Sequence, residues 1–173
     1  MIGASMASRV KAAAGVRMIW LSGILLMASA GRATAGVDAF PRQELNVNLF
    51  RSPSMGMEYA RAGISVHFGF FPSVLSRGAK GEEGTIRFLK IGTTLFFLPL
   101  ERSGGKTPSS FYVSMAYLHG VDDDWRHAFS AEGGFRWFVW EGLNLRLGGG
   151  AIVGQGHRTQ LIFTEGVGWS FPL

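Results

Sequence analysis

Two histidines on either side of a short acidic stretch are the residues of this chain best suited to chemistry. His119 and His127 flank Asp122-Asp123-Asp124, and Ser130 follows three residues after His127. In a Ser-His-acid set, the imidazole takes the hydroxyl proton and the acid orients the ring, so a hydrolytic site is one hypothesis. No known motif fixes this spacing, and such a loop is usually solvated. We therefore disfavour an enzyme and assign no catalytic residue.

The sequence offers no cofactor or metal site. The consecutive carboxylates Asp122-Asp123-Asp124 diverge and lack the spacing of a calcium loop. Gly148-Gly149-Gly150 lacks the lysine and the helix that complete a phosphate-binding loop. The absence of cysteine excludes disulfides and thiolate chemistry. We expect neither a cofactor nor a bound metal.

A second group of polar residues alternates with large apolar residues along strand-like segments. A period of two places the two sets on opposite faces of a β-strand. If the apolar rows point outward, the polar rows fill an interior, where charges must pair because an unpaired buried charge is costly. We predict an interior polar network. Its expected members are Glu58, His67, Lys90, Glu132, Arg136, Asn144 and Arg146.

Eight segments carry the alternation. They span residues 44–51, 55–60, 63–71, 85–98, 110–119, 127–139, 142–152 and 159–173. Several reach the roughly 9–11 residues of a tilted transmembrane strand, whereas strands of soluble proteins average about 5–6 residues. The last segment alternates almost to the end of the chain, and such an apolar strand needs the protection of a closed barrel. The pattern predicts an all-β fold, a single up-and-down antiparallel transmembrane β-barrel of eight strands.

The expected connections are short at one end of this barrel and mostly longer at the other, as in outer-membrane barrels. Residues 61–63 and 140–142 resemble tight turns, whereas longer connections are expected at 72–84, 120–126 and 153–158. The exception is 99–108, a long polar connection on the side of the tight turns.

Two charged residues, Arg87 and Glu165, depart from the alternation. We expect Arg87 near the outer rim, where its side chain can reach the membrane surface. We expect Glu165 at a rim or opposite a β-bulge.

Aromatic residues are expected in girdles at the two membrane interfaces, where rings with a polar edge are favoured. The expected interfacial residues are Tyr59, Trp125, Trp137, Trp140, Trp169 and Phe171.

The first 35 residues resemble a secretory signal peptide. A basic segment precedes an apolar run from Met18 to Ala30, and Ala33-Thr34-Ala35 supplies the small residues of a cleavage site. We expect a signal peptide at 1–35 and a barrel domain at 36–173. The predicted leader carries four basic and no acidic residues, so its removal lowers the formal net charge from +5 to +1. The basic composition is therefore no argument for nucleic-acid binding.

The alternating segments, Ala33-Thr34-Ala35 and the ending Val167-Gly168-Trp169-Ser170-Phe171-Pro172-Leu173 resemble the small outer-membrane β-barrel proteins of Gram-negative bacteria, the eight-stranded OmpA/OmpX-type superfamily. The resemblance implies a membrane protein of the bacterial outer membrane. It also implies contact with outer-membrane lipids, lipopolysaccharide and the outer-membrane assembly machinery. Because eight strands leave room only for packed side chains, a wide porin-like channel is disfavoured.

The favoured function is a structural or surface-loop interaction role, with the interior filled by Glu, Arg and His. One alternative is a lipid A-modifying, deacylase-like enzyme that uses a loop histidine. Another is a soluble lipocalin-like barrel that binds an apolar ligand, and this alternative requires the large apolar faces to point inward.

Overall fold

The computed structural model describes residues 39–51, 55–77, 82–100, 107–121, 125–155 and 157–173. All of them belong to one compact unit, Gly36–Leu173. The predicted signal peptide lies outside the described residues. Within the described ranges, no helix has both the length and the apolar character needed to cross a membrane.

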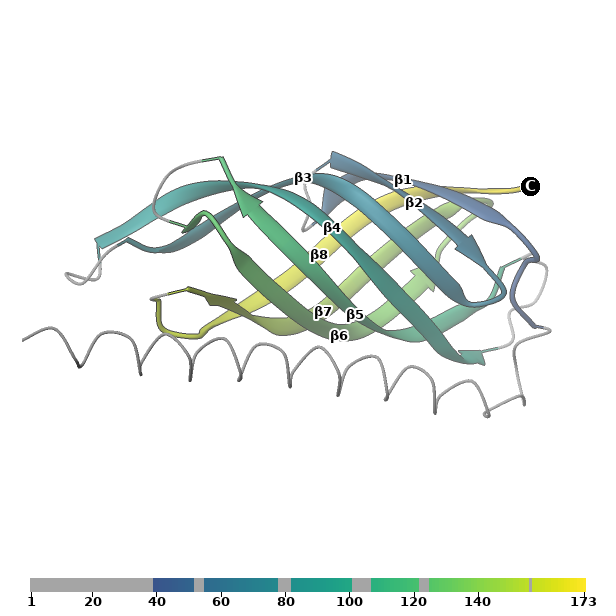
Figure 1. Cartoon of the computed structure of the whole chain (residues 1–173). Helices are drawn as coiled ribbons and strands as arrows, with labels where there is room; N and C mark the ends of the chain where they lie inside the picture. Colours follow the sequence, from purple (N-terminus) through teal and green to yellow (C-terminus); the bar gives the residue numbers. More distant parts are fainter. Residues whose placement is uncertain (1–38, 52–54, 78–81, 101–106, 122–124, 156) are drawn as a thin grey trace, which may run out of the picture. The chain divides into compact units, whose positions relative to one another are not determined.

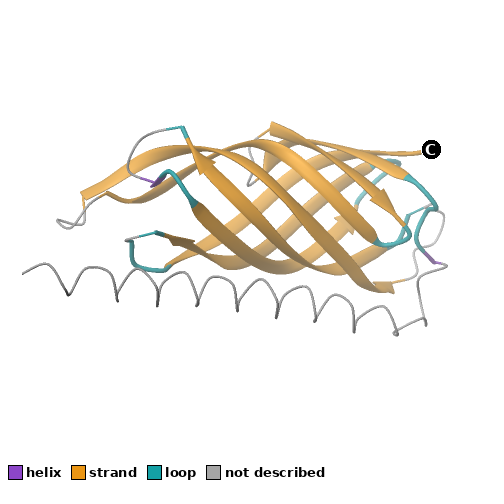
Figure 2. Cartoon of the chain, in the orientation of Figure 1, coloured by secondary structure: helices purple, strands orange, loops and turns teal. Residues whose placement is uncertain are grey.

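Strands make up most of the described chain (Figure 2). In order they are β1 (Glu44–Arg51), β2 (Met55–Arg61), β3 (Ile64–Arg77), β4 (Glu82–Leu100), β5 (Ser109–Gly120), β6 (Ala128–Phe138), β7 (Leu143–Gly154) and β8 (Gln160–Pro172). Each lies over one of the predicted segments. The predicted all-β order of eight strands is confirmed.

Every strand pairs antiparallel with its sequence neighbour, and β1 also pairs with β8, so one up-and-down sheet closes into a ring (Figure 1). Along the closing seam Leu45 pairs with Phe171 and Val47 with Trp169, and the register shifts between Asn48 and Phe50. Closure gives the terminal strands partners on both sides, so neither is left as an open edge.

The ring has two different ends, which we call the turn end and the loop end. The turn end carries the β2–β3 and β6–β7 connections and Leu173, and the loop end carries the β3–β4, β5–β6 and β7–β8 connections (Figure 1). The β2–β3 turn consists of Ala62 (φ 49°) and Gly63 (φ 84°). Two successive positive φ angles are typical of the type I′ turn that matches the twist of a hairpin.

The β3–β4 hairpin is longer than the sequence predicted. The expected loop at 72–84 is mostly strand, because pairing continues from Pro72 with Arg87 to Arg77 with Glu82. Pro72 is tolerated because its missing N–H is not needed for the pairing with β4. The carbonyl of Arg87 accepts a bond from Val121, the residue just beyond β5 (2.8 Å), so the Pro72–Arg87 pair is a non-hydrogen-bonded one.

The alternation of side chains gives the ring a mostly apolar outer face and an inner face that is polar in the middle and apolar toward both ends. Glu44, Asn46 and Asn48 of β1 are buried, whereas Met55 and Met57 of β2 are more than half exposed. The same pattern holds along the other strands: the side chains on the outer surface include Ile64, Val66, Phe68, Ile91, Leu145, Leu147, Leu161 and Phe163. This is the reverse of the usual distribution in a water-soluble protein.

Candidate functional site

The interior of the ring contains three ion pairs among the described residues, and the first joins the start of β1 to β6. Arg136 donates through Nη1 to Oε1 of Glu44 at 2.9 Å. The same oxygen accepts a bond from the Ser170 hydroxyl at 2.8 Å. The guanidinium also lies over the rings of Phe96 and Phe138, 3.9 and 4.7 Å from their centroids. Two rings and a carboxylate therefore fix the Arg136 head group.

The second ion pair joins Glu58 of β2 to Arg146 of β7 across the ring. Both oxygens of Glu58 are used, since Oε1 accepts from the Ser65 hydroxyl at 2.6 Å and Oε2 accepts from Asn46 Nδ2 at 3.3 Å. Asn144 extends the network, because its Nδ2 donates to Asn46 Oδ1 and its Oδ1 accepts from Arg146 Nε. Such additional hydrogen bonds are what makes a buried ion pair tolerable.

The third ion pair and a neutral network complete the interior. Lys90 Nζ lies 3.5 Å from Glu132 Oε2 and 5.3 Å from the centroid of the Phe71 ring. His67 Nδ1 is in hydrogen-bond contact with the Thr94 hydroxyl at 3.3 Å, and Thr94 donates to Ser114 at 3.1 Å. The structure thus buries all seven residues predicted for the interior and brings each into contact with other interior side chains.

Glu44 and Asn46 belong to the same network but are not among the seven residues predicted for it. Their signal was present, because both share the buried parity of β1 with Asn48. Three carboxylates, from Glu44, Glu58 and Glu132, face three cations, so the charges of these ion pairs balance. Each carboxylate is paired with a cation from another strand, so the network joins strands across the ring.

Apolar clusters fill the interior at both ends. Toward the loop end, eight buried residues pack together: Phe71, Leu75, Ile86, Phe88, Leu118, Trp125, Ala128 and Ile152. Toward the turn end, the buried cluster contains Phe40, Ala60, Phe96 and Tyr112. Side chains therefore occupy the described interior along its length, as expected for a ring of eight strands.

Tyr112 is accommodated by glycines in the next two strands of the ring, β6 and β7. A Cβ atom on Gly148 would lie 2.7 Å from the Tyr112 hydroxyl, and one on Gly134 would lie 2.9 Å from it. The ring can occupy the interior only because these two positions carry no side chain.

The prediction for Trp125 is wrong. We expected an interfacial residue, but its side chain is 1% exposed and belongs to the interior cluster at the loop end. It stacks on His157 at 4.2 Å between ring centroids and meets the edge of Phe88 at 6.4 Å. The residue follows the described end of β5 by several positions, so strand parity could not assign it to a face.

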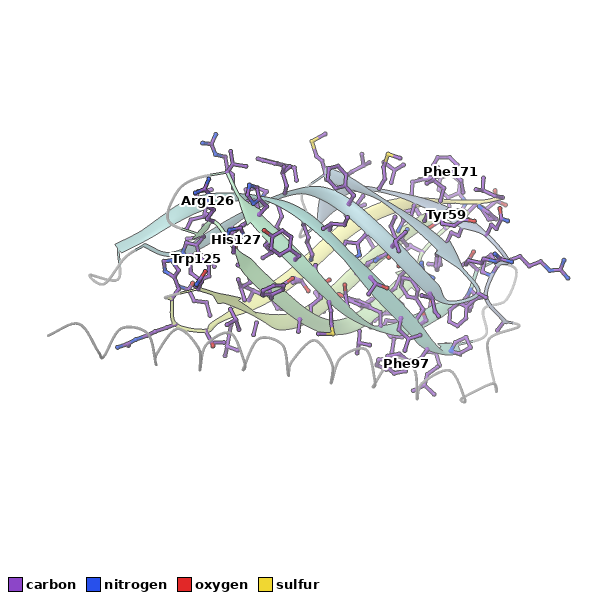
Figure 3. All side chains as sticks on the ribbon, viewed as in Figure 1. Tyr59, Phe97, Trp125, Arg126, His127 and Phe171 are labelled. Carbon is purple, nitrogen blue, oxygen red and sulfur yellow. The ribbon has the colours of Figure 1, made fainter. Side chains whose placement is uncertain are left out.

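The other predicted interfacial aromatics lie on the outer surface. Tyr59, Trp137, Trp140, Trp169 and Phe171 are between 36% and 67% exposed. Figure 3 labels Tyr59, Phe97 and Phe171 near the turn end, and Trp125, Arg126 and His127 near the loop end. Trp137 continues a row of outer rings, with centroids 4.6 Å from Phe135, which in turn lies 4.9 Å from Phe111.

The two charged residues that break the alternation both point outward. Arg87 is exposed on β4, next to the loop end. Glu165 is exposed in β8, opposite Leu147 of β7, where the β7–β8 register is continuous. On its other side, the described pairing with β1 reaches Gly166, and the register shifts at Val167 and Gly168. Glu165 therefore lies close to an irregularity of the closing seam.

The structure brings the candidate histidines His119 and His127 together but separates Ser130 from His127. His127 is exposed on the outside, whereas Ser130 is buried inside, because the two positions have opposite parity. Asp122, Asp123 and Asp124 lie outside the described residues. No group of three or more His, Cys, Asp or Glu side chains in the described ranges is placed to hold a metal ion.

No protein-family model, curated protein or solved structure matches the chain. Its function must therefore be inferred from the fold and from the chemistry of its side chains.

Proposed function

We propose that this protein is an integral β-barrel of a bacterial outer membrane, closed to solute flow, with a structural role or a role in presenting its loops to the outside. The proposal assigns the turn end to the periplasm and the loop end to the exterior, following the usual distribution of short turns and long loops in such barrels.

The observation that carries the proposal is the inverted burial of side chains. The interior holds three ion pairs, whereas the outer surface exposes large apolar side chains on every strand that the structure describes in full. Large exposed apolar surfaces on a monomer indicate an interaction site, and a surface that surrounds the molecule fits the hydrocarbon of a bilayer. The lipocalin-like alternative requires the opposite arrangement, so we do not favour it.

Two further features support the same proposal. Backbone groups in a bilayer need partners within the protein, and a ring without open edges supplies them. Strands β3 to β8 have 11 to 19 residues, which is enough to cross the hydrocarbon core when tilted. The filled interior argues against a channel and favours a stabilising or loop-presenting role.

The experiment that tests this proposal is expression of the full chain in a Gram-negative host, followed by membrane fractionation and gel electrophoresis with and without heating. We expect the protein in the outer-membrane fraction, with a compact band that shifts on boiling. A folded protein that stays soluble without detergent would rule the proposal out, and a large single-channel conductance in planar bilayers would rule out its closed interior.

A further inference from the structure

Three side chains on the outer surface near the loop end converge on one point. Tyr117 and His119 lie two residues apart on β5, and therefore on the same face. The pairing of Leu118 with Ala128 brings His127, just before β6, next to His119, and the two imidazole centroids are 5.9 Å apart. Both histidines are exposed, and Tyr117 is half-buried beneath them.

The ring nitrogens of both histidines face the phenol. The Tyr117 hydroxyl lies 2.6 Å from Nδ1 of His127 and 3.4 Å from Nδ1 of His119. The short contact is a hydrogen bond. If Tyr117 donates it, the lone pair of His127 Nδ1 points toward the phenol oxygen. Two imidazole nitrogens and a phenol oxygen thus converge without any contribution from the interior network.

From this convergence we propose that Tyr117, His119 and His127 bind a divalent transition-metal ion, of the Cu²⁺ or Zn²⁺ class, on the outer surface. Neutral imidazole is a preferred ligand of both ions. Ligand–metal distances of about 2.0–2.1 Å place two ligands of a tetrahedral ion about 3.3 Å apart, close to the present distance between Tyr117 and His119. The contact with His127 widens as the ion replaces the phenol proton, which passes to solvent.

Both histidines of this site are exposed in the structure, and two arginines lie near them. Arg126 adjoins His127, and Arg87 lies two residues beyond Leu89, the β4 partner of His119. Both arginines are exposed, so their repulsion of a cation is screened by salt. A metal site of this composition was not expected from the sequence, because it needs a phenol and two histidines from different strands. It does not depend on the membrane proposal, since the donors face outward in detergent, in a bilayer or in water.

The test is a titration of the tag-free folded protein with Zn²⁺ by calorimetry and with Cu²⁺ by absorbance. We expect one saturable site and, with Cu²⁺, a phenolate charge-transfer band in the visible range. His119→Gln and His127→Gln should each weaken binding by at least about tenfold, and Tyr117→Phe should abolish the band.

The matched control is His157→Gln, which removes a histidine at the same end of the ring but outside the cluster. It should change the affinity by less than about twofold, since surface substitutions away from a site have small effects. Absence of saturable binding in the wild-type protein would overturn the proposal. An equal loss of affinity in His157→Gln would also overturn it, because the ion would then bind elsewhere.

Discussion

Glu44 and Arg136 lie 92 residues apart in the sequence and meet inside the ring at 2.9 Å. Their strands, β1 and β6, are not neighbours in the sheet. The contact therefore crosses the interior of the ring. Removing it by mutation tests how much the polar interior stabilises the fold.

Replacing Arg136 with Met should destabilise the folded ring by about 3–5 kcal/mol, because the Glu44 carboxylate stays buried without its cation. The measurement is urea unfolding in lipid vesicles or detergent, followed by tryptophan fluorescence. The double variant Glu44→Gln/Arg136→Met should recover part of the loss. Arg126→Gln, an exposed arginine at the loop end, should change stability by less than about 0.5 kcal/mol. Equal effects of Arg126→Gln and Arg136→Met would show that the interior pair has no special role.

Two outer positions with nearly equal exposure should respond very differently to a positive charge. Ile91 and Val121 are 57% and 56% exposed, but Ile91 lies in the middle of β4 and Val121 lies just beyond β5 at the loop end. In a bilayer, Ile91→Arg should cost about 2–4 kcal/mol and Val121→Arg about 0–1 kcal/mol. The measurement is the free energy of unfolding from vesicles. Equal, small effects would contradict insertion in a membrane, because two equally exposed positions in water should tolerate an arginine equally well.

Glu165 should limit the stability of the protein in a membrane. Its outward position between Phe163 and Val167 places a carboxylate against lipid under the proposed function. Glu165→Leu should raise the free energy of unfolding from vesicles by about 1 kcal/mol or more, since a charge on the lipid-facing side of a barrel is unfavourable. Glu141→Leu, at the β6–β7 turn, serves as the control and should have little effect. A loss of stability in Glu165→Leu would instead reveal that this carboxylate makes a needed contact.

Two adjacent glycines of β7 should differ sharply in their tolerance of a methyl group. A Cβ on Gly148 would meet the Gly133 carbonyl at 2.6 Å and the Tyr112 hydroxyl at 2.7 Å, whereas one on Gly149 would find its nearest atom at 3.6 Å. Gly148→Ala should therefore cost about 1–3 kcal/mol, and Gly149→Ala should be nearly neutral. Thermal unfolding followed by the band shift on gels compares the two. Similar melting of both variants would show that the interior relaxes around Tyr112.

Strand parity predicted a large part of the fold. In β2 and the first half of β7, for example, apolar residues recur at every second position, and this period alone indicates which face each residue occupies. Parity does not, however, determine which interior residues meet. Glu58 reaches Arg146, and Glu44 reaches Arg136, only because of the register and the curvature of the closed sheet.

The deviations from the prediction have local causes. The β3–β4 hairpin continues past Pro72 because the missing N–H is not needed for pairing with β4, and the sequence does not reveal which pairs of an antiparallel ladder are hydrogen-bonded. Trp125 turns inward from a connection, where parity carries no information. The contact between Tyr117 and His127 depends on the register between β5 and β6, which the sequence leaves open.

The closing seam between β1 and β8 also constrains the order of events during folding. The first strand to leave the ribosome finds its second partner only when the last strand has been made, so the ring cannot close on a nascent chain. Until β8 is made, β1 exposes unpaired backbone groups on one side, and the Glu44 carboxylate lacks the hydrogen bond from the Ser170 hydroxyl. The protein must therefore be kept from aggregating until synthesis is complete, and removal of its final strand should abolish folding altogether.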